Sequence, residues 1–393
     1  MKSYQKALEK RKQQHLLRTL PLFIEGIDFY SNDYLGLSQS EELRQRIEEV
    51  YQSIGKRKNG ATGSRLLSGN SEYAEEVEQK VAAFHKSESA LIYSSGYAAN
   101  LGLISSLATK DTTLIMDELV HASLIDGARL GVSKRIRFRH NDVEDLNKKL
   151  QKIEGEKLVI VESIYSMDGD VCPLKEVSRV CEKWDAQLIV DEAHSFGIIG
   201  EKGEGLCQKL QLENQVLARI MTFGKGPGIH GAAVVGPLWL KEYQVNFSRP
   251  FIFSTAPSPH HFASISAMYD VVKDAVLNRT ALQNVIDYFI ERKKESDNNW
   301  LSSPTQIQSL IVPGNSEVIS VANSFHKQGI IALPIRKPSV AVGTERIRFC
   351  LHAFNTKKEV DLIFETLSRK ISPLEENESG QAGKKDANFM KND

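Results

Sequence analysis

The sequence has little of what marks secreted, metal-bound or membrane proteins. It contains four cysteines among 393 residues, and none of them forms a C-x-x-C pair. That spacing fits neither a disulfide framework nor a zinc site, so we expect reduced thiols, a cytoplasmic protein and no metal. No stretch approaches 18 consecutive apolar residues, and the first residues are charged. We therefore expect neither a membrane span nor a secretory signal.

An excess of charge of either sign is also missing. Lys and Arg together number 50, as do Asp and Glu. This balance gives no reason to expect nucleic acid or an anionic membrane surface as a partner, although a local basic patch for a phosphorylated ligand remains compatible with it. The content of 41% hydrophobic and 25% charged residues is ordinary for a globular protein. The length favours two or three domains, or one large domain with a smaller one.

What the chain does contain is an alternation of short apolar runs with helical stretches. Such continuous apolar strands predict an α/β fold whose mainly parallel sheet is covered on both faces. Ligands bind such sheets beyond the carboxyl ends of the strands. The runs occupy residues 90–93, 113–116, 157–161, 188–190 and 218–221. The polar residues that follow them are Ser94, Ser95, Asp117, Glu162, Ser166, Asp191, His194 and Lys225.

The pattern divides the chain into four parts. We expect an N-terminal helix and arm (1–45), a large domain (46–275), a small α+β domain (276–374) and a disordered polar tail (375–393). The expected helices span residues 3–19, 40–55, 71–86, 262–298 (one helix or a pair), 316–328 and 357–370. Two further apolar runs, at 309–313 and 346–351, belong to the small domain.

Lys225 lies between glycines in the segment Thr-Phe-Gly-Lys-Gly-Pro-Gly, residues 222–228. A lysine in a glycine loop is ordinarily a surface residue. Asp191 changes that expectation, because it ends a second apolar run and two strand ends can bring an acid and a lysine to one edge. A pyridoxal phosphate (PLP) enzyme needs this pair: the lysine forms a Schiff base and the acid keeps the pyridine nitrogen protonated. The alternative for Asp191 is a helix N-cap.

The segment Asp-Glu-Ala-His, residues 191–194, also resembles the metal-binding box of a helicase. That interpretation requires a G-x-x-x-x-G-K-[ST] phosphate loop, which the chain does not contain. We therefore expect His194 to reach the cofactor or the substrate instead.

A phosphate site is indicated by Ser95, Gly96 and Tyr97, which open a helix after a strand. The N–H groups at a helix N-terminus favour a phosphate. The hydroxyl of Thr222 can add to the same site. His121 is a candidate for stacking on the cofactor ring, and its alternative is a half-buried helix histidine.

Together these residues resemble the α-oxoamine synthases, a family of fold-type-I PLP enzymes. The resemblance covers residues 15–370 with motifs in matching order, and it implies a large domain with a mainly parallel sheet plus a smaller α+β C-terminal domain. The motifs are Ser-Asn-Asp-Tyr-Leu-Gly at 31–36, Ser-Gly-Tyr-Ala-Ala-Asn at 95–100, His-Ala-Ser at 121–123, Ser-Met-Asp-Gly-Asp at 166–170, Asp-Glu-Ala-His-Ser-Phe-Gly at 191–197 and Thr-Phe-Gly-Lys at 222–225.

The resemblance implies roles for the cofactor site. Lys225 would be the Schiff-base lysine and the proton-transfer base, and Asp191 the partner of the pyridinium. His194 would contact the phenolic oxygen of PLP, and His121 would stack on the ring. Ser166 would lie near the ring. Gly96, Tyr97 and Thr222, with Ser95, would bind the phosphate.

Other implied roles concern the substrate and a second subunit. Ser254 and Thr255 match a segment that reaches the phosphate from the neighbouring subunit, so the resemblance implies a homodimer with shared sites. Arg348 would bind the carboxylate of the amino acid, since a guanidinium suits bidentate pairing. Arg18, Asn32 and His121 would also contact substrate.

Within the family, residues 138–142 (Phe-Arg-His-Asn-Asp) and 335–340 (Ile-Arg-Lys-Pro-Ser-Val) favour the members that serve biotin synthesis. Their reaction condenses L-alanine with a pimeloyl thioester, carried by CoA or an acyl carrier protein, and releases CO₂ and the thiol. The chain departs from the expected Arg-Pro-Pro-Thr-Val-Pro at Lys337, Ser339 and Ala341. Ser339 keeps a hydroxyl for substrate, while Lys337 adds a charge. Gly226-Pro227 after the lysine is a further departure.

Three alternatives stay open. The first is a sister enzyme of the family that uses glycine and acetyl-CoA, or another α-oxoamine synthase. An aminotransferase would share the fold, although the motifs follow the synthases. A catalytically dead partner subunit is a non-enzyme alternative, and the retention of Lys225, Asp191, His194 and His121 argues against it.

Overall fold

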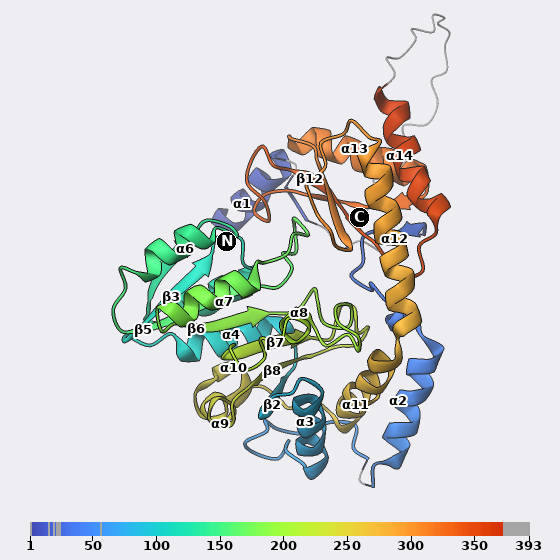
Figure 1. Cartoon of the computed structure of the whole chain (residues 1–393). Coiled ribbons are helices and arrows are strands. Elements are labelled where there is room, and N and C mark those ends of the chain that lie inside the picture. The colour runs from blue at the N-terminus through green and yellow to red at the C-terminus, as the bar shows by residue number, and fades with distance from the viewer. Residues whose placement is uncertain (1, 15, 19, 21–24, 56, 372–393) are drawn as a thin grey trace, which may run out of the picture.

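The computed structural model describes residues 2–14, 16–18, 20, 25–55 and 57–371, and its two layered parts are visible in Figure 1. The predicted tail, 375–393, lies outside the described residues. Among the helices that are described, none is long and apolar enough to cross a bilayer. The boundaries at 45, 275 and 374 stay a prediction.

The larger part is built on a seven-stranded sheet within the described residues. Its neighbouring strands are, in order, β2 (Ser89–Tyr93), β8 (Ala232–Gly236), β7 (Ala218–Thr222), β6 (Gln187–Asp191), β5 (Glu156–Glu162), β3 (Thr112–Asp117) and β4 (Lys134–Phe138). β8 runs antiparallel to both of its neighbours, and the other pairs are parallel. The predicted mainly parallel sheet is therefore confirmed, and all five apolar runs are strands.

Both faces of this sheet are covered. Along β2, Ala90 and Ile92 belong to one buried cluster, whereas Leu91 and Tyr93 belong to another, as the two-residue period of a strand requires. The helices of this part are α2 (Glu41–Ser53), α3 (Glu72–Phe84), α4 (Gly96–Leu107), α5 (Ala122–Leu130), α6 (Val143–Leu150), α7 (Leu174–Lys183), α8 (Leu206–Lys209), α9 (Leu238–Phe247), α10 (Arg249–Ile252) and α11 (Pro259–Asp274).

The smaller part follows the chain from α12 (Val276–Lys294), so the predicted span 262–298 is a pair of helices. An antiparallel sheet places β12 (Arg346–Cys350) between β9 (Ile307–Ile311) and β11 (Leu333–Ile335). α13 (Asn315–Lys327) and α14 (Lys357–Ile371) complete it and match the predicted helices.

The N-terminal arm joins the two parts. β1 (Ile27–Asp28) pairs in parallel with β10 (Ile330–Ile331) of the smaller part. The turn that follows leads through a 3₁₀ helix, η1 (Leu37–Gln39), into α2, which packs on α11 of the larger part. The first helix is shorter than predicted: α1 (Lys2–Gln13) ends well before residue 19 and buries none of its residues.

Candidate active site

A cavity of about 250 Å³ lies beyond the carboxyl ends of β5, β6 and β7, where the sequence predicted the site. It brings together many of the predicted residues, which come from the arm, the start of α4, the loop before α5 and the ends of the strands. Those that line it are Asn32, Ser95, Gly96, Tyr97, His121, Asp191, His194, Thr222 and Lys225.

Lys225 follows β7 by three residues and reaches back toward the end of β6. Its Nζ lies 2.8 Å from Nε2 of His194. Burial lowers the pKa of the Lys225 amine to about 8, against the opposing effect of Asp191 and Glu162. The neutral form is therefore much more populated near neutral pH than for an ordinary lysine, and only a neutral amine attacks an aldehyde or accepts a proton.

The turn after Lys225 is held firmly by the arm. The N–H of Gly228 donates to the carbonyl of Lys225 over 2.9 Å, and Pro227 is buried within the turn. Gly228 has a φ of +76°, and a Cβ there would lie 2.5 Å from the nitrogen of Ser38. The turn that contains Gly226 and Pro227 is therefore closed by this hydrogen bond, and it packs closely against η1 at Gly228.

Asp191 ends β6 and is only 4% exposed. Its Oδ2 accepts a 2.7 Å hydrogen bond from Nδ2 of Asn100 on α4, and its Oδ1 accepts from the N–H of Ala193. The same amide nitrogen of Asn100 donates to Oγ of Ser123, which lies 2.7 Å from Nδ1 of His121. A chain of hydrogen bonds thus joins the buried carboxylate to the candidate stacking histidine.

His121 forms the N-cap of α5 and lines the cavity. Desolvation lowers the pKa of its imidazole, with a smaller opposing effect from Asp191. Its backbone N–H donates to Glu162 at the end of β5. Burial, and then the nearby Asp191, raises the pKa of the Glu162 carboxyl well above its usual range.

His194 connects the lysine to the N-terminal arm. Its Nδ1 lies 2.8 Å from the hydroxyl of Tyr34, which itself donates to Oδ1 of Asn32 over 2.9 Å. The hydroxyl therefore accepts from Nδ1–H, and this leaves Nε2 as the acceptor that faces Lys225. Burial and then the Lys225 charge lower the pKa of His194 well below its usual value, consistent with a neutral imidazole.

Arg348 on β12 reaches the same group of side chains from the smaller part of the molecule. Its Nη2 donates to Oδ1 of Asn32 over 2.6 Å and lies 3.4 Å from the hydroxyl of Tyr34. Its Nε is a buried donor with no partner among the described residues. A buried guanidinium with a free donor is suited to a carboxylate, because two parallel N–H groups can pair with two oxygens.

The opposite end of the cavity is formed by the start of α4. Ser95 caps the helix by accepting from the N–H of Ala98, and the N–H of Ala99 donates to its carbonyl. In the part of the chain that the structure describes, the N–H groups of Gly96 and Tyr97 therefore remain for a ligand. A Cβ on Gly96 would lie 2.5 Å from Cγ2 of Thr222, so only glycine lets the helix start approach this strand end so closely.

These features fit PLP. A free pair of helix N–H groups suits its phosphate. The buried carboxylate of Asp191 suits a protonated ring nitrogen. Beside it, Oδ1 of Asn100 is buried and has no partner among the described residues. The partly neutral Lys225 suits covalent attachment.

Other predicted residues lie outside the residues that line this cavity. Ser166 lies in the turn after β5, partly exposed. Ser254 and Thr255 follow α10 and are exposed, and so are Arg18 and Ser339. Their predicted roles stay predictions.

Several residues of the site were not assigned from the sequence. Tyr34 lies in the motif at 31–36, close to Asn32, and Asn100 lies in the motif at 95–100, near the start of α4. Their membership of these motifs was the available signal. Glu162 was noticed only as a polar strand end. Gln306 had no local signal, yet its amide donates to the carbonyl of His194 over 2.9 Å.

The fold and the site define a fold-type-I PLP enzyme, and the chain belongs to the class I and II aminotransferase family, whose model matches residues 24–367. Within it, the relatives are α-oxoamine synthases. An 8-amino-7-oxononanoate synthase from Marinobacter nauticus is 36% identical over 389 residues, covering 96% of this chain and 98% of its own. One from Cellvibrio japonicus is 35% identical and covers 94% of each chain.

Solved structures agree. A serine palmitoyltransferase from Sphingomonas wittichii superimposes with a TM-score of 0.82 at 29% identity, covering 88% of this chain and 86% of its own. The 8-amino-7-oxononanoate synthase from Francisella tularensis gives 0.76 at 26%, covering 88% of this chain and 98% of its own. The resemblance seen in the sequence is therefore confirmed at the level of the family and the fold.

Proposed function

We propose that this protein condenses L-alanine with a pimeloyl thioester to give 8-amino-7-oxononanoate, CO₂ and the free thiol carrier. The observation that carries the proposal is the chain of contacts from Lys225 through His194 and Tyr34 to Arg348. It links an amine able to accept a proton to a guanidinium able to hold a carboxylate. Relatives that match over nearly the whole chain are named for the product, 8-amino-7-oxononanoate. The resemblance seen in the sequence supplies the two substrates.

The residues divide the work by position. Arg348 holds the amino acid carboxylate, and Asn32 fixes the guanidinium by accepting from Nη2. When bound, PLP supplies an electron sink for negative charge at the α-carbon. Asp191, oriented by Asn100, keeps the ring nitrogen charged. Gly96, Tyr97, Thr222 and Ser95 bind the phosphate.

Proton movement centres on Nζ of Lys225. The neutral amine takes the α-proton, and Nε2 of His194 accepts a hydrogen bond from it, which directs the amine lone pair. The hydroxyl of Tyr34 holds His194 in the tautomer that this requires. His121, Ser166 and Ser339 are proposed to contact the ring or the acyl substrate, and Arg18 the substrate from the arm.

We also propose a cytoplasmic homodimer with shared active sites. The segment with Ser254 and Thr255 is exposed and follows Phe253, which is 70% exposed, and Tyr97 at the mouth of the cavity is 47% exposed. All four cysteines are buried and unpaired, as expected of a reducing compartment. A mixed dimer of Lys225→Ala and Thr255→Arg chains should recover activity that neither variant has alone. No recovery in a purified mixed dimer would contradict shared sites.

The test of the reaction is a matrix of small amino acids and acyl thioesters, with CoA release as the readout. We expect release with L-alanine and pimeloyl-CoA, or with the same acyl group on a carrier protein. Release only with glycine and acetyl-CoA would assign the sister activity instead. A protein that cannot be loaded with PLP at all would refute the proposal.

A further inference from the structure

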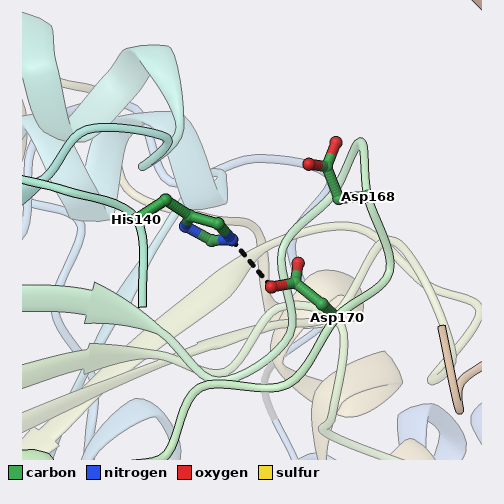
Figure 2. Close-up of side chains that lie close together, drawn as sticks. All are labelled: His140, Asp168 and Asp170. Carbon is green, nitrogen blue, oxygen red and sulfur yellow. Dashed lines mark hydrogen bonds and ion pairs between the residues drawn. The ribbon is translucent and has the colours of Figure 1, made fainter. Parts of the chain in front are cut away.

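Two sequence motifs contain residues that the proposed chemistry does not use: residues 138–142, and residues 167–170, which follow Ser166. The structure brings them together. Figure 2 shows the imidazole of His140 pointing at the carboxylate of Asp170, with Asp168 on the same loop. The loop 166–170, between β5 and α7, is called the latch loop below.

The latch loop is fastened to the larger part by His140. Nε2 of His140 lies 2.7 Å from Oδ2 of Asp170, and Nδ1 lies 3.0 Å from Oδ1 of Asp117 at the end of β3. Asn141 strengthens the link by donating to the same oxygen of Asp170 over 2.6 Å. Burial opposes the charge on His140, yet the hydrogen bonds to Asp117 and Asp170 raise its pKa to about 10. It is therefore an imidazolium between two carboxylates at neutral pH.

The other side of the latch loop is fastened to the smaller part. Asp168 forms an ion pair with Arg346 on β12, whose side chain is 7% exposed. Oγ of Ser309 on β9 donates to the carbonyl of Met167 over 2.7 Å. The carbonyl of Gly169 accepts from Thr305 over 2.7 Å.

Gly169 shows how close this packing is. Its φ is +75°, and a Cβ there would lie 2.2 Å from the carbonyl oxygen of Ile307 at the start of β9. Glycine is therefore needed for the loop to reach the small sheet.

The strand that the latch loop holds is the strand that carries the substrate arginine. Arg346 and Arg348 are two residues apart on β12, so their side chains leave the same face of the sheet. Arg346 bonds to the large-domain loop, and Arg348 bonds to Asn32 near Lys225. A shift of β12 relative to the large sheet would move both guanidinium groups together.

We propose that the latch loop sets the distance between Arg348 and Lys225, and that Asp168, Arg346 and His140 are positioning residues for the amino acid carboxylate. This inference rests on the proposed function for the identity of that carboxylate. Its physical basis is that a side chain placed by a fixed support binds a substrate in one geometry, and a loose support costs binding.

A metal ion is the competing explanation, because the ligand atoms of His140, Asp168 and Asp170 all lie within 4.8 Å of one another. Both ring nitrogens of His140 are already bonded to carboxylates, and Asp168 is paired with Arg346. A metal would need a neutral imidazole with a free nitrogen. Asp170 and Asp168 are thus already paired with the cationic side chains of His140 and Arg346, in place of a metal ion.

The experiment compares Asp168→Asn, Arg346→Met and the double variant as PLP-loaded holoenzymes. The readouts are the KM for alanine, kcat, the PLP content and the alanine concentration that half-saturates the absorbance change of the bound cofactor. We expect each single variant to raise the KM for alanine on the order of tenfold or more, with PLP content unchanged. The double variant should raise the KM no further than the more severe single variant does, because both substitutions remove the same ion pair.

Two further variants keep the test decisive. Arg346→Lys retains the charge and should recover much of the loss. Arg44→Met breaks a matched but exposed ion pair with Glu41 on α2 and should leave the KM unchanged. If Arg346→Met does not fold, Asp168→Asn carries the same test, since it is isosteric and on a partly exposed side chain.

An unchanged KM for alanine in every latch variant, with only the melting temperature lowered, would overturn the inference. So would a change in the wild-type KM on adding EDTA or Zn²⁺, which would favour a metal site. If the wild type does not turn over alanine and pimeloyl-CoA, the proposed function fails separately. The latch can then still be tested, because half-saturation of the absorbance change needs only a small amino acid that binds.

Discussion

Nζ of Lys225 lies 2.8 Å from Nε2 of His194, although the two residues come from different strand ends and are 31 positions apart. His194 is held in turn by the hydroxyl of Tyr34 in the N-terminal arm. The reactive amine is therefore oriented by the arm as well as by the sheet.

Replacing Lys225 with alanine should abolish covalent PLP attachment and lower kcat by at least about 10²-fold, the smaller end of a general base contribution. The visible absorbance of the bound cofactor and CoA release are the measurements. Lys202→Ala, an exposed lysine outside the cavity, is the control. A variant at 225 that stays coloured after dialysis and remains active would show that another group is the anchor.

Covalent attachment of PLP to the apoprotein should become faster as pH rises through about 8. The pKa of the Lys225 amine is lowered to that value by burial, so below it the amine is mostly protonated and unreactive. Stopped-flow absorbance across pH 6–10 gives the midpoint. A midpoint near 10.5, the ordinary value for lysine, would contradict the burial argument.

Gly96→Ala should weaken PLP binding about tenfold, because the added Cβ meets Cγ2 of Thr222 at 2.5 Å and overpacking costs about 1–3 kcal/mol. Thr222→Ser removes that methyl group and keeps the hydroxyl. The double variant should therefore bind PLP more tightly than Gly96→Ala alone, as measured by titrating the apoprotein. Absence of this recovery would mean that the tight contact does not shape the phosphate site.

Tyr34→Phe should raise the KM for alanine about tenfold, since Nδ1 of His194 loses its partner and a buried unpaired group costs about 1–3 kcal/mol. Steady-state kinetics with varied alanine is the measurement. Tyr288→Phe is the matched control, because the Tyr288 hydroxyl bonds only to Asp361 at the surface among the contacts described. Equal effects of the two variants would argue against a role for Tyr34 in the site.

The parts of this molecule that follow from local pattern were predictable. Apolar runs gave β2, β3, β5, β6 and β7, whereas the inner strand β8 was not predicted. Polar residues after these runs gave Asp191, Thr222 and Lys225, since parallel strands end at one edge. β4 was missed because it is an edge strand with the sequence Lys-Arg-Ile-Arg-Phe, in which charges hide the alternation. α1 ends at Gln13, although the charged and apolar alternation continues to residue 19.

The contacts that complete the site depend on tertiary packing. Tyr34 reaches His194 across 160 positions, and Gln306 reaches the same residue across 112. Neither spacing leaves a periodic signal in the chain. The contact between His140 and Asp170 was likewise visible only as two separate motifs. They meet because β4, which precedes His140, and β5, which precedes the latch loop, both pair with β3.

The central claim is that the Lys225 site joins alanine to a pimeloyl group with loss of the alanine carboxylate. The most direct test uses alanine labelled at its carboxyl carbon, with pimeloyl-CoA and the PLP-loaded protein, and measures labelled CO₂ against CoA released. The account predicts one labelled CO₂ for each CoA, and neither product with Lys225→Ala. CoA release without labelled CO₂, or conversion of alanine to pyruvate in its place, would contradict it.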